Sequence, residues 1–399
     1  MIKLSKRARD ITPSHIRNNS DLRADSCKIY HLNIGQPDLE PPKEFVDGII
    51  KYSNDPFTYV SAQGIDELRD AWSKHINLHY NTTLSKDDFL ITSGSSEALM
   101  IAFNTCCDVG EEILVLSPSY GNYIGFSTMT GVKLVPVPCV FDGNFRPPAN
   151  LEEIVKRITP KTRALLVCNP NNPTGTVLTE DELKKLAGVC KEHDMFLIVD
   201  EVYRELVYDN RTPRTSLSLS EYSQNVVVLD SLSKRFSLCG ARIGCLISKN
   251  EEFMSSAINF ASVRVSTNIL EQKASEHLLT NLPDIYIPKM VQEYKNRRDT
   301  LVKHLKKIPN IELNIPQGGF YIFAKLPVND SEDFCKFMEY KFDVNGCTVA
   351  VAPAKGFYIN DSKPLNNGVR IAFVLSSQDL VKAVDIIQKA LEIYGNKTI

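Results

Sequence analysis

The chain has 399 residues, of which 43% are hydrophobic and 24% are charged. This composition is typical of a globular protein, and the length allows two domains with a large buried core. The 46 basic and 48 acidic residues leave a formal net charge of −2. No strong field of either sign attracts nucleic acid or a membrane surface, so we expect small-molecule partners.

The cysteines and the N-terminus point to the cytoplasm. The 10 cysteines are scattered without a CxxC pair or a neighbouring histidine cluster, so no metal site is expected. The basic N-terminus lacks the apolar stretch of a signal peptide, and no run reaches the roughly 18 apolar residues of a membrane span. A reducing cytoplasmic location fits these features.

Short apolar runs alternate with helical patterns between about residue 90 and residue 250. An amphipathic segment at 181–193 separates two of the runs. This alternation predicts an α/β fold, with a mostly parallel sheet flanked by helices. The predicted strands are 113–117, 134–138, 164–168, 196–200, 226–230 and 243–248.

After about residue 285 the pattern predicts a smaller α/β domain. Its predicted helices are 286–308, 332–342 and 377–394, and its strands are 318–326, 348–353 and 368–375. The proline-containing first 45 residues are expected to cross the surface and join it. The resulting domains are a large one at 46–285 and a small one formed by 1–45 and 286–399.

Ligands of parallel sheets bind beyond the carboxyl ends of the strands, where this chain places several polar residues. Lys234, in SLSKRFSLCGARIG, follows the strand at 226–230. Desolvation and nearby cations lower the pKa of such a lysine and make it a better nucleophile toward an aldehyde. A solvated lysine beside Arg235 is the alternative.

Three further segments contain candidate cofactor contacts. Ser95 and Ser96 open a helix whose backbone N–H groups suit a phosphate, although an ordinary N-cap has the same pattern. Asn172 lies in NPNNPTGT, a loop fixed by two Asn-Pro steps, or a turn without a ligand. Asp200 ends an apolar strand and needs a partner such as a protonated ring nitrogen, unless it caps a helix. Tyr203 follows it and can reach a neighbouring oxygen.

Two more segments suggest ring and carboxylate binding. Tyr120 or Tyr123, in SPSYGNY, can stack on a flat ring, or serve as core aromatics. Arg370 begins an apolar strand, and its guanidinium matches a carboxylate in a bidentate manner. A structural ion pair with an acidic residue is the alternative for this arginine.

In this order, GSSEAL, NPNNPTG, DEVY, SLSKRFSLCGARIG and VRIAF resemble the class I/II aminotransferases, a fold-type I family dependent on pyridoxal 5'-phosphate. The resemblance extends from about residue 32 to residue 373. It implies transfer of an amino group between an L-amino acid and a 2-oxo acid by a ping-pong mechanism. It also implies a homodimer in the cytoplasm.

The resemblance assigns roles to individual residues. Lys234 is the implied Schiff-base lysine and proton shuttle, and Asp200 the implied partner of the pyridine nitrogen. The implied cofactor-binding residues are Ser95, Ser96, Tyr120, Asn172, Asp200, Tyr203, Ser231, Lys234, Arg242 and, from the neighbouring subunit, Tyr59. The implied substrate-binding residues are Gly35, Asn172 and Arg370.

Some segments differ from the usual pattern, and they concern the substrate side chain. Ala241 and the segment 352–358 resemble an aspartate-aminotransferase-like branch. An acidic substrate needs a second cation, for which Arg264 and Lys355 are candidates, with a solvated surface charge as the alternative for each.

Other functions compete with transamination. A related enzyme with the same cofactor, such as a carbon–sulfur lyase, a cyclase or an oxidase, would have the same motifs. A non-catalytic sensor domain is disfavoured because no helix-turn-helix pattern or basic face is found. A nucleotide-binding dehydrogenase or kinase is excluded by the lack of a G-x-G pair and a P-loop.

Overall fold

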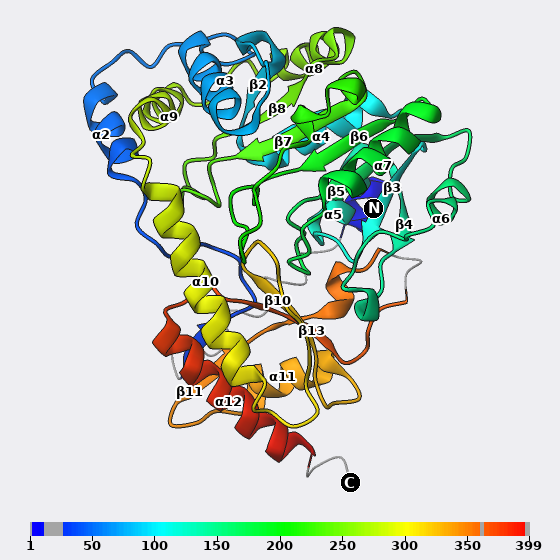
Figure 1. Cartoon of the computed structure of the whole chain (residues 1–399), viewed down its shortest axis with the longest axis vertical. Coiled ribbons are helices and arrows are strands. Elements are labelled where there is room, and N and C mark those ends of the chain that lie inside the picture. Colours follow the sequence, from blue (N-terminus) through cyan, green and yellow to red (C-terminus); the bar gives the residue numbers. More distant parts are fainter. Residues whose placement is uncertain (1, 12–26, 360–362, 396–399) are drawn as a thin grey trace.

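The computed structural model describes residues 2–11, 27–359 and 363–395. Figure 1 shows a large α/β domain above a smaller one, with the long helix α10 (Tyr286–Leu305) running from the first into the second. This architecture confirms the predicted fold class.

The large domain is built on a seven-stranded sheet in the described part of the chain, with strand order β2-β8-β7-β6-β5-β3-β4. Strand β8 (Gly244–Ser248) runs antiparallel to both of its neighbours, β2 and β7, and the other strand pairs of this sheet are parallel. The other strands are β2 (Phe89–Thr92), β3 (Glu112–Ser117), β4 (Lys133–Pro138), β5 (Thr162–Cys168), β6 (Phe196–Asp200) and β7 (Val226–Ser231). The six apolar runs therefore form strands as predicted.

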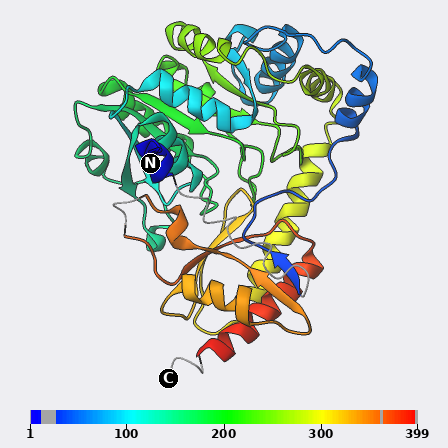
Figure 2. The same cartoon turned by 180° about the vertical axis from the view of Figure 1, so that it is seen from behind.

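Successive residues of the central strands belong to different cores. Leu165 and Val228 pack in one hydrophobic cluster, whereas Leu166 and Leu229 pack in another. Alternate side chains of a strand point to opposite faces, so both faces of the sheet are buried. Seen from behind, α4 (Gly94–Cys106) lies across one of these faces (Figure 2).

The helices of the large domain begin and end close to their sequence signals. Thr179 caps α7 with a reciprocal bond to Glu182, a capping box that fixes the start of the predicted amphipathic helix. The helices other than α4 are α2 (Lys43–Tyr52), α3 (Asp66–Tyr80), α5 (Asn122–Thr130), α6 (Glu152–Val155), α7 (Glu180–Glu192), α8 (Glu251–Ser262) and α9 (Ile269–Asn281).

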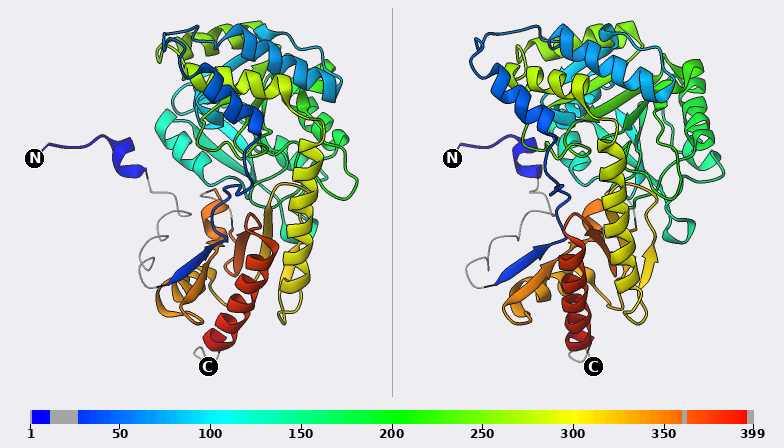
Figure 3. Two further views of the ribbon diagram at one scale, coloured as in Figure 1. Left: turned by 90° about the vertical axis from the view of Figure 1, so that its left-hand side faces the viewer. Right: turned by 60° about the vertical axis from the view of Figure 1, so that its left-hand side comes forward.

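The small domain has its own sheets and core. Helices α10 and α12 pack side by side, as the views in Figure 3 show. A four-stranded sheet has the order β12-β13-β10-β9, and β1 pairs with β11 in parallel. The elements are β1 (Lys28–His31), β9 (Glu312–Asn314), β10 (Tyr321–Lys325), β11 (Cys347–Ala350), β12 (Ala352–Pro353), β13 (Gly368–Ala372), α11 (Ser331–Lys341) and α12 (Ser377–Gly395).

One predicted strand is divided in the structure. The segment 348–353 contributes β11 to the pair with β1 and β12 to the four-stranded sheet. Pro353 has no backbone N–H to donate, which restricts it to an edge strand such as β12. The periodicity of the sequence does not reveal this change of sheet.

The N-terminal segment contacts both domains. Helix α1 (Lys6–Asp10) lies against the large domain, where Arg7 Nη1 donates to the carbonyl of Met129 at 3.0 Å. Strand β1 then joins the small domain. Across the described residues, no helix has the length and apolar character required to cross a membrane.

Candidate active site

The sheet brings the carboxyl ends of β5, β6 and β7 together, since these strands are parallel neighbours. Asn172 follows β5, Asp200 ends β6, and Lys234 follows β7. Side chains separated by more than 60 positions therefore meet at one edge, which is where open α/β sheets bind ligands.

Lys234 has the environment of a nucleophile. Its Nζ donates to the carbonyl oxygen of Gly35 at 2.9 Å. Burial lowers the pKa of the amine below its usual value, and the positive charges of Arg370 and Arg242 lower it further. The predicted direction is thus confirmed, and a larger fraction of the amine is neutral near pH 7.

Asp200 is a buried carboxylate without a cation of its own. Burial raises its pKa to about 6, against the opposing hydrogen bonds from Tyr123 and Val202. The Tyr123 hydroxyl donates to Oδ2 at 2.8 Å and the Val202 N–H donates to Oδ1 at 3.3 Å. Within the described ranges no basic side chain forms an ion pair with this carboxylate, so a cationic ligand group would fit here.

Arg370 is a buried cation without a carboxylate partner among the described residues. It is 1% exposed, and burial lowers its pKa. One Nη donates to Asn172 Oδ1 at 2.9 Å, the other to the carbonyl of Asn33, and Nε has no partner. The guanidinium lies between the rings of Tyr321 and Phe357, at 4.3 and 4.5 Å from their centroids. No described acidic residue forms the structural ion pair that was the alternative for this arginine.

Tyr321 links the two domains at this site. Its hydroxyl lies 3.0 Å from the hydroxyl of Tyr203, which is buried on the large domain. A Cβ on Gly35 would lie 1.7 Å from the Tyr321 oxygen, so only glycine fits beside it. Tyr120 is near enough to Tyr321 and Arg370 to affect their pKa values.

A cup of backbone and hydroxyl groups forms where α4 meets the Lys234 loop. Gly94 has a φ of +71°, and a Cβ there would lie 2.5 Å from Arg242 Nη2. A Cβ on Gly244 would lie 2.8 Å from the backbone nitrogen of Ser95. Ser96 follows in the first turn, and Ser231 Oγ, at the end of β7, lies 2.8 Å from Ser233 Oγ. Close backbone approach and unpaired N–H groups at a helix start suit a phosphate.

A buried network of charges lies under the same loop. Asp230 accepts two bonds from Arg235, at 2.8 and 2.9 Å, and one from Arg204 at 2.9 Å. Burial opposes ionisation of Asp230, but the two arginines outweigh it and lower its pKa. Asp230 ends its strand as Asp200 does, yet it is an ion-pair residue that fixes Arg235 beside Lys234.

Three residues of the sequence-based interpretation are exposed or have partners other than the groups of this cluster. Tyr59 is 85% exposed. Arg264 is paired with Glu97 at 2.7 Å. The exposed Lys355 is paired with Glu332 at 3.0 Å. Each of these two cations therefore has a carboxylate partner in its own chain.

The sequence missed three contacts. It gave Tyr123 as a stacking ring or a core aromatic, whereas the ring is buried and its hydroxyl donates to Asp200. It gave no role to Tyr321 or Phe357, which enclose Arg370. Tyr321 and Phe357 belong to an apolar strand and an apolar loop, and a pattern of this kind predicts only that the side chains are buried.

The geometry can be compared with known proteins. The family model described as aminotransferase class I and II matches residues 28–387. The chain belongs to the class I and II aminotransferases. This membership confirms the resemblance and makes the protein an aminotransferase.

The relatives differ in substrate. An aspartate aminotransferase of Thermotoga maritima is 31% identical, with 91% of each chain covered. An aromatic-amino-acid aminotransferase of Thermococcus litoralis is 29% identical, with 98% of each covered. The solved aspartate aminotransferase of Thermus thermophilus with maleate has a TM-score of 0.88 and 25% identity, covering 98% of this chain and 100% of that one.

Proposed function

We propose that this aminotransferase holds pyridoxal 5'-phosphate covalently through Lys234 Nζ and moves an amino group between an L-amino acid and a 2-oxo acid by a ping-pong mechanism. The observation that supports this most directly is the convergence of a desolvated lysine, an unpaired buried carboxylate and an unpaired buried arginine.

The residues fit the cofactor group by group. No described basic side chain forms an ion pair with Asp200, so its carboxylate can pair with a protonated pyridine nitrogen. Hydrogen bonds from Tyr123 and Val202 orient its two oxygens. The cofactor, when bound, supplies an electron sink for the electrons released at the substrate α-carbon. Keeping that nitrogen protonated is the role of Asp200 in this proposal.

The remaining cofactor contacts follow from the same edge. Ser95, Ser96, Ser231 and Arg242 are proposed to bind the phosphate. Asn172 and Tyr203 are proposed to donate to the phenolic oxygen, and Tyr120 to stack on the ring.

Arg370 and Gly35 are proposed to bind the substrate carboxylate. Tyr321 and Phe357 restrict the guanidinium to one plane, so it presents its donor edge in a fixed direction. Lys234, once released from the cofactor, would hold the α-proton on Nζ and move it across the face of the site. Closure of the small domain (1–45 and 286–399) on the large domain (46–285) when the carboxylate binds would exclude water.

The proposed assembly is a cytoplasmic homodimer. The exposed Tyr59 is proposed to reach the phosphate of the neighbouring subunit. The aspartate-like substrate preference remains part of the proposal, supported by the aspartate aminotransferases among the relatives. Because Arg264 and Lys355 have acidic partners in their own chain, neither is assigned to the substrate side chain.

An absorbance spectrum tests the function. The purified protein should show the visible band of bound cofactor, and one member of a panel of aspartate, glutamate, alanine, arginine and an aromatic amino acid should convert it to the band of the aminated cofactor. Lys234→Ala should lose turnover. Persistence of the visible band with every amino acid would rule out transamination of these substrates. Formation of a lyase, cyclase or oxidase product would assign the enzyme to that reaction instead.

A further inference from the structure

A cavity lies between the large domain and the start of α10, away from the residues of the candidate active site. It has a volume of about 880 Å³ and is enclosed by α3, by the junction of α9 with α10, and by the loop after Tyr203. None of the residues proposed to bind cofactor or substrate lines it. Its apolar lining includes Ala71, Leu279, Pro283 and Ile287.

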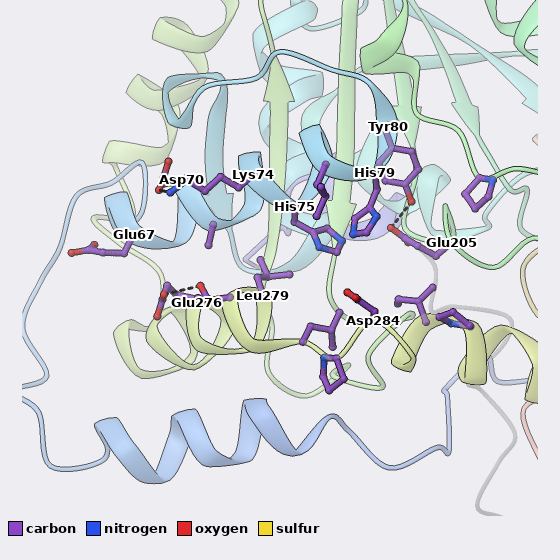
Figure 4. A pocket seen from close by; sticks show the side chains of 18 of the residues that line it. Glu67, Asp70, Lys74, His75, His79, Tyr80, Glu205, Glu276, Leu279 and Asp284 are labelled. Atoms are coloured by element: carbon purple, nitrogen blue, oxygen red, sulfur yellow. Dashed lines mark hydrogen bonds and ion pairs between the residues drawn. The ribbon is translucent and has the colours of Figure 1, made fainter.

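One end of the cavity carries an aromatic hydroxyl bonded to a carboxylate. Figure 4 shows Tyr80 and Glu205 at one end, where the Tyr80 hydroxyl donates to Glu205 Oε1 at 3.0 Å. Arg204 and Arg235 pair with Glu205 at 3.3 and 3.2 Å, and both arginines also pair with Asp230. This end of the cavity is therefore polar, and its carboxylate shares its arginines with a second buried carboxylate.

His75 is a buried side chain with unused hydrogen-bonding capacity. It is 9% exposed, lines the cavity, and contacts the edge of the His79 ring at 4.8 Å between centroids (Figure 4). In the part of the chain that the structure describes, neither ring nitrogen has a hydrogen-bond partner. Burial, followed by the charge of Arg235, lowers the pKa of His75 to about 3. The neutral ring thus offers one donor and one acceptor to a ligand.

The rim of the cavity is acidic. Glu67, Asp70, Glu276 and Asp284 line it, and its one lysine among the described residues, Lys74, is paired with Asp70. The Thr280 hydroxyl donates to Glu276 at 3.0 Å, a neutral contact that leaves the carboxylate charge in place. Among the described residues no basic side chain forms an ion pair with Glu67, Glu276 or Asp284, so the rim carries negative charge that attracts cations and repels anions.

We propose that this cavity is an accessory binding site for a small, flat organic cation that carries N–H donors, of the amidinium or guanidinium class. The apolar body would lie against Leu279 and Ile287. An N–H group would donate to the free acceptor nitrogen of His75, and the rim carboxylates would balance the charge. The site does not depend on the proposed cofactor chemistry.

A matched set of ligands tests the site on the holoenzyme. In ligand-observed fluorine NMR, 4-fluorobenzamidinium should bind saturably with a dissociation constant on the order of 1 mM, as expected for about ten heavy atoms. The nearly isosteric neutral 4-fluorobenzamide should bind at least about fivefold more weakly. Maleate, present in the solved Thermus enzyme, should not displace the amidinium.

Variants locate the binding. Glu276→Gln with Asp284→Asn should weaken the amidinium about fivefold, and Thr280→Trp, at an exposed rim position, should block it. Glu192→Gln removes an exposed carboxylate that does not line the cavity, and should bind as the unaltered protein does. Failure of saturable binding, displacement by maleate, or equal affinities of the rim variants and Glu192→Gln would each overturn the proposal. The absorbance test of the cofactor site is unaffected by any of these results.

Discussion

Replacing Asp200 with asparagine should change the pH dependence of stability in the cofactor-free protein. Burial raises the pKa of this carboxyl from 3.8 to about 6. Below pH 3.8 the group is protonated in both the folded and the unfolded chain, and it adds nothing to the pH dependence. Between pH 3.8 and 6 the unfolded chain ionises first, so the folded state loses stability as the pH rises.

The size of the effect follows from the shift. A difference of about 2 pKa units corresponds to about 3 kcal/mol, which is reached above pH 6 and stays constant beyond it. Asparagine does not titrate, so Asp200→Asn should gain about 3 kcal/mol relative to the unaltered protein between about pH 4 and pH 7. Any fixed cost of the mismatched amide near the Val202 N–H shifts the whole curve without changing its slope.

The assay is urea denaturation at several pH values, and the quantity compared is the free energy of unfolding of the two proteins. Asp194→Asn, at an exposed position just before the same strand, is the control and should give a curve parallel to the unaltered protein. With cofactor bound, the gain of Asp200→Asn should disappear, because the ring nitrogen then compensates the carboxylate. Parallel curves for Asp200→Asn in the cofactor-free protein would refute the reasoning about an uncompensated buried carboxylate.

Three further changes test other parts of the site. Arg370→Lys should lower kcat/KM by about a hundredfold, because a lysine cannot make the bidentate, ring-stacked contact. The control Lys355→Ala should change kcat/KM little. Equal losses of the two variants in steady-state assays would contradict the assignment of Arg370 to the substrate carboxylate. Mixed dimers of Tyr59→Ala and Lys234→Ala chains should recover about a quarter of the normal activity if Tyr59 acts across the interface, whereas no recovery after subunit exchange would keep it within its own subunit. Arg235→Met should lower the free energy of unfolding by about 3–5 kcal/mol, because it leaves Asp230 with an incomplete ion pair. A free energy of unfolding equal to that of an exposed-site variant such as Arg211→Met would show that the network does not stabilise the fold.

Much of the fold was determined locally. The apolar runs of four to seven residues specify buried strands because only a sheet covered on both faces accommodates them. The capping box at Thr179 and Glu182 fixes the start of α7, and the change of pattern after residue 285 marks the smaller domain. The ordered motifs were sufficient to identify the family.

The tertiary structure alone decided how the polar groups are paired. Asp200 and Asp230 both end apolar strands, yet one lacks a cation and the other holds two arginines. Arg370 has no carboxylate partner among the described residues, and one of its donors is instead bonded to Asn172, from a loop almost 200 positions away. The partners of a buried charge come from distant segments, and no local pattern encodes which segment arrives. The sequence therefore identified the residues capable of the chemistry, and the packing of distant strands and loops decided which of them have unsatisfied charge to use on a ligand.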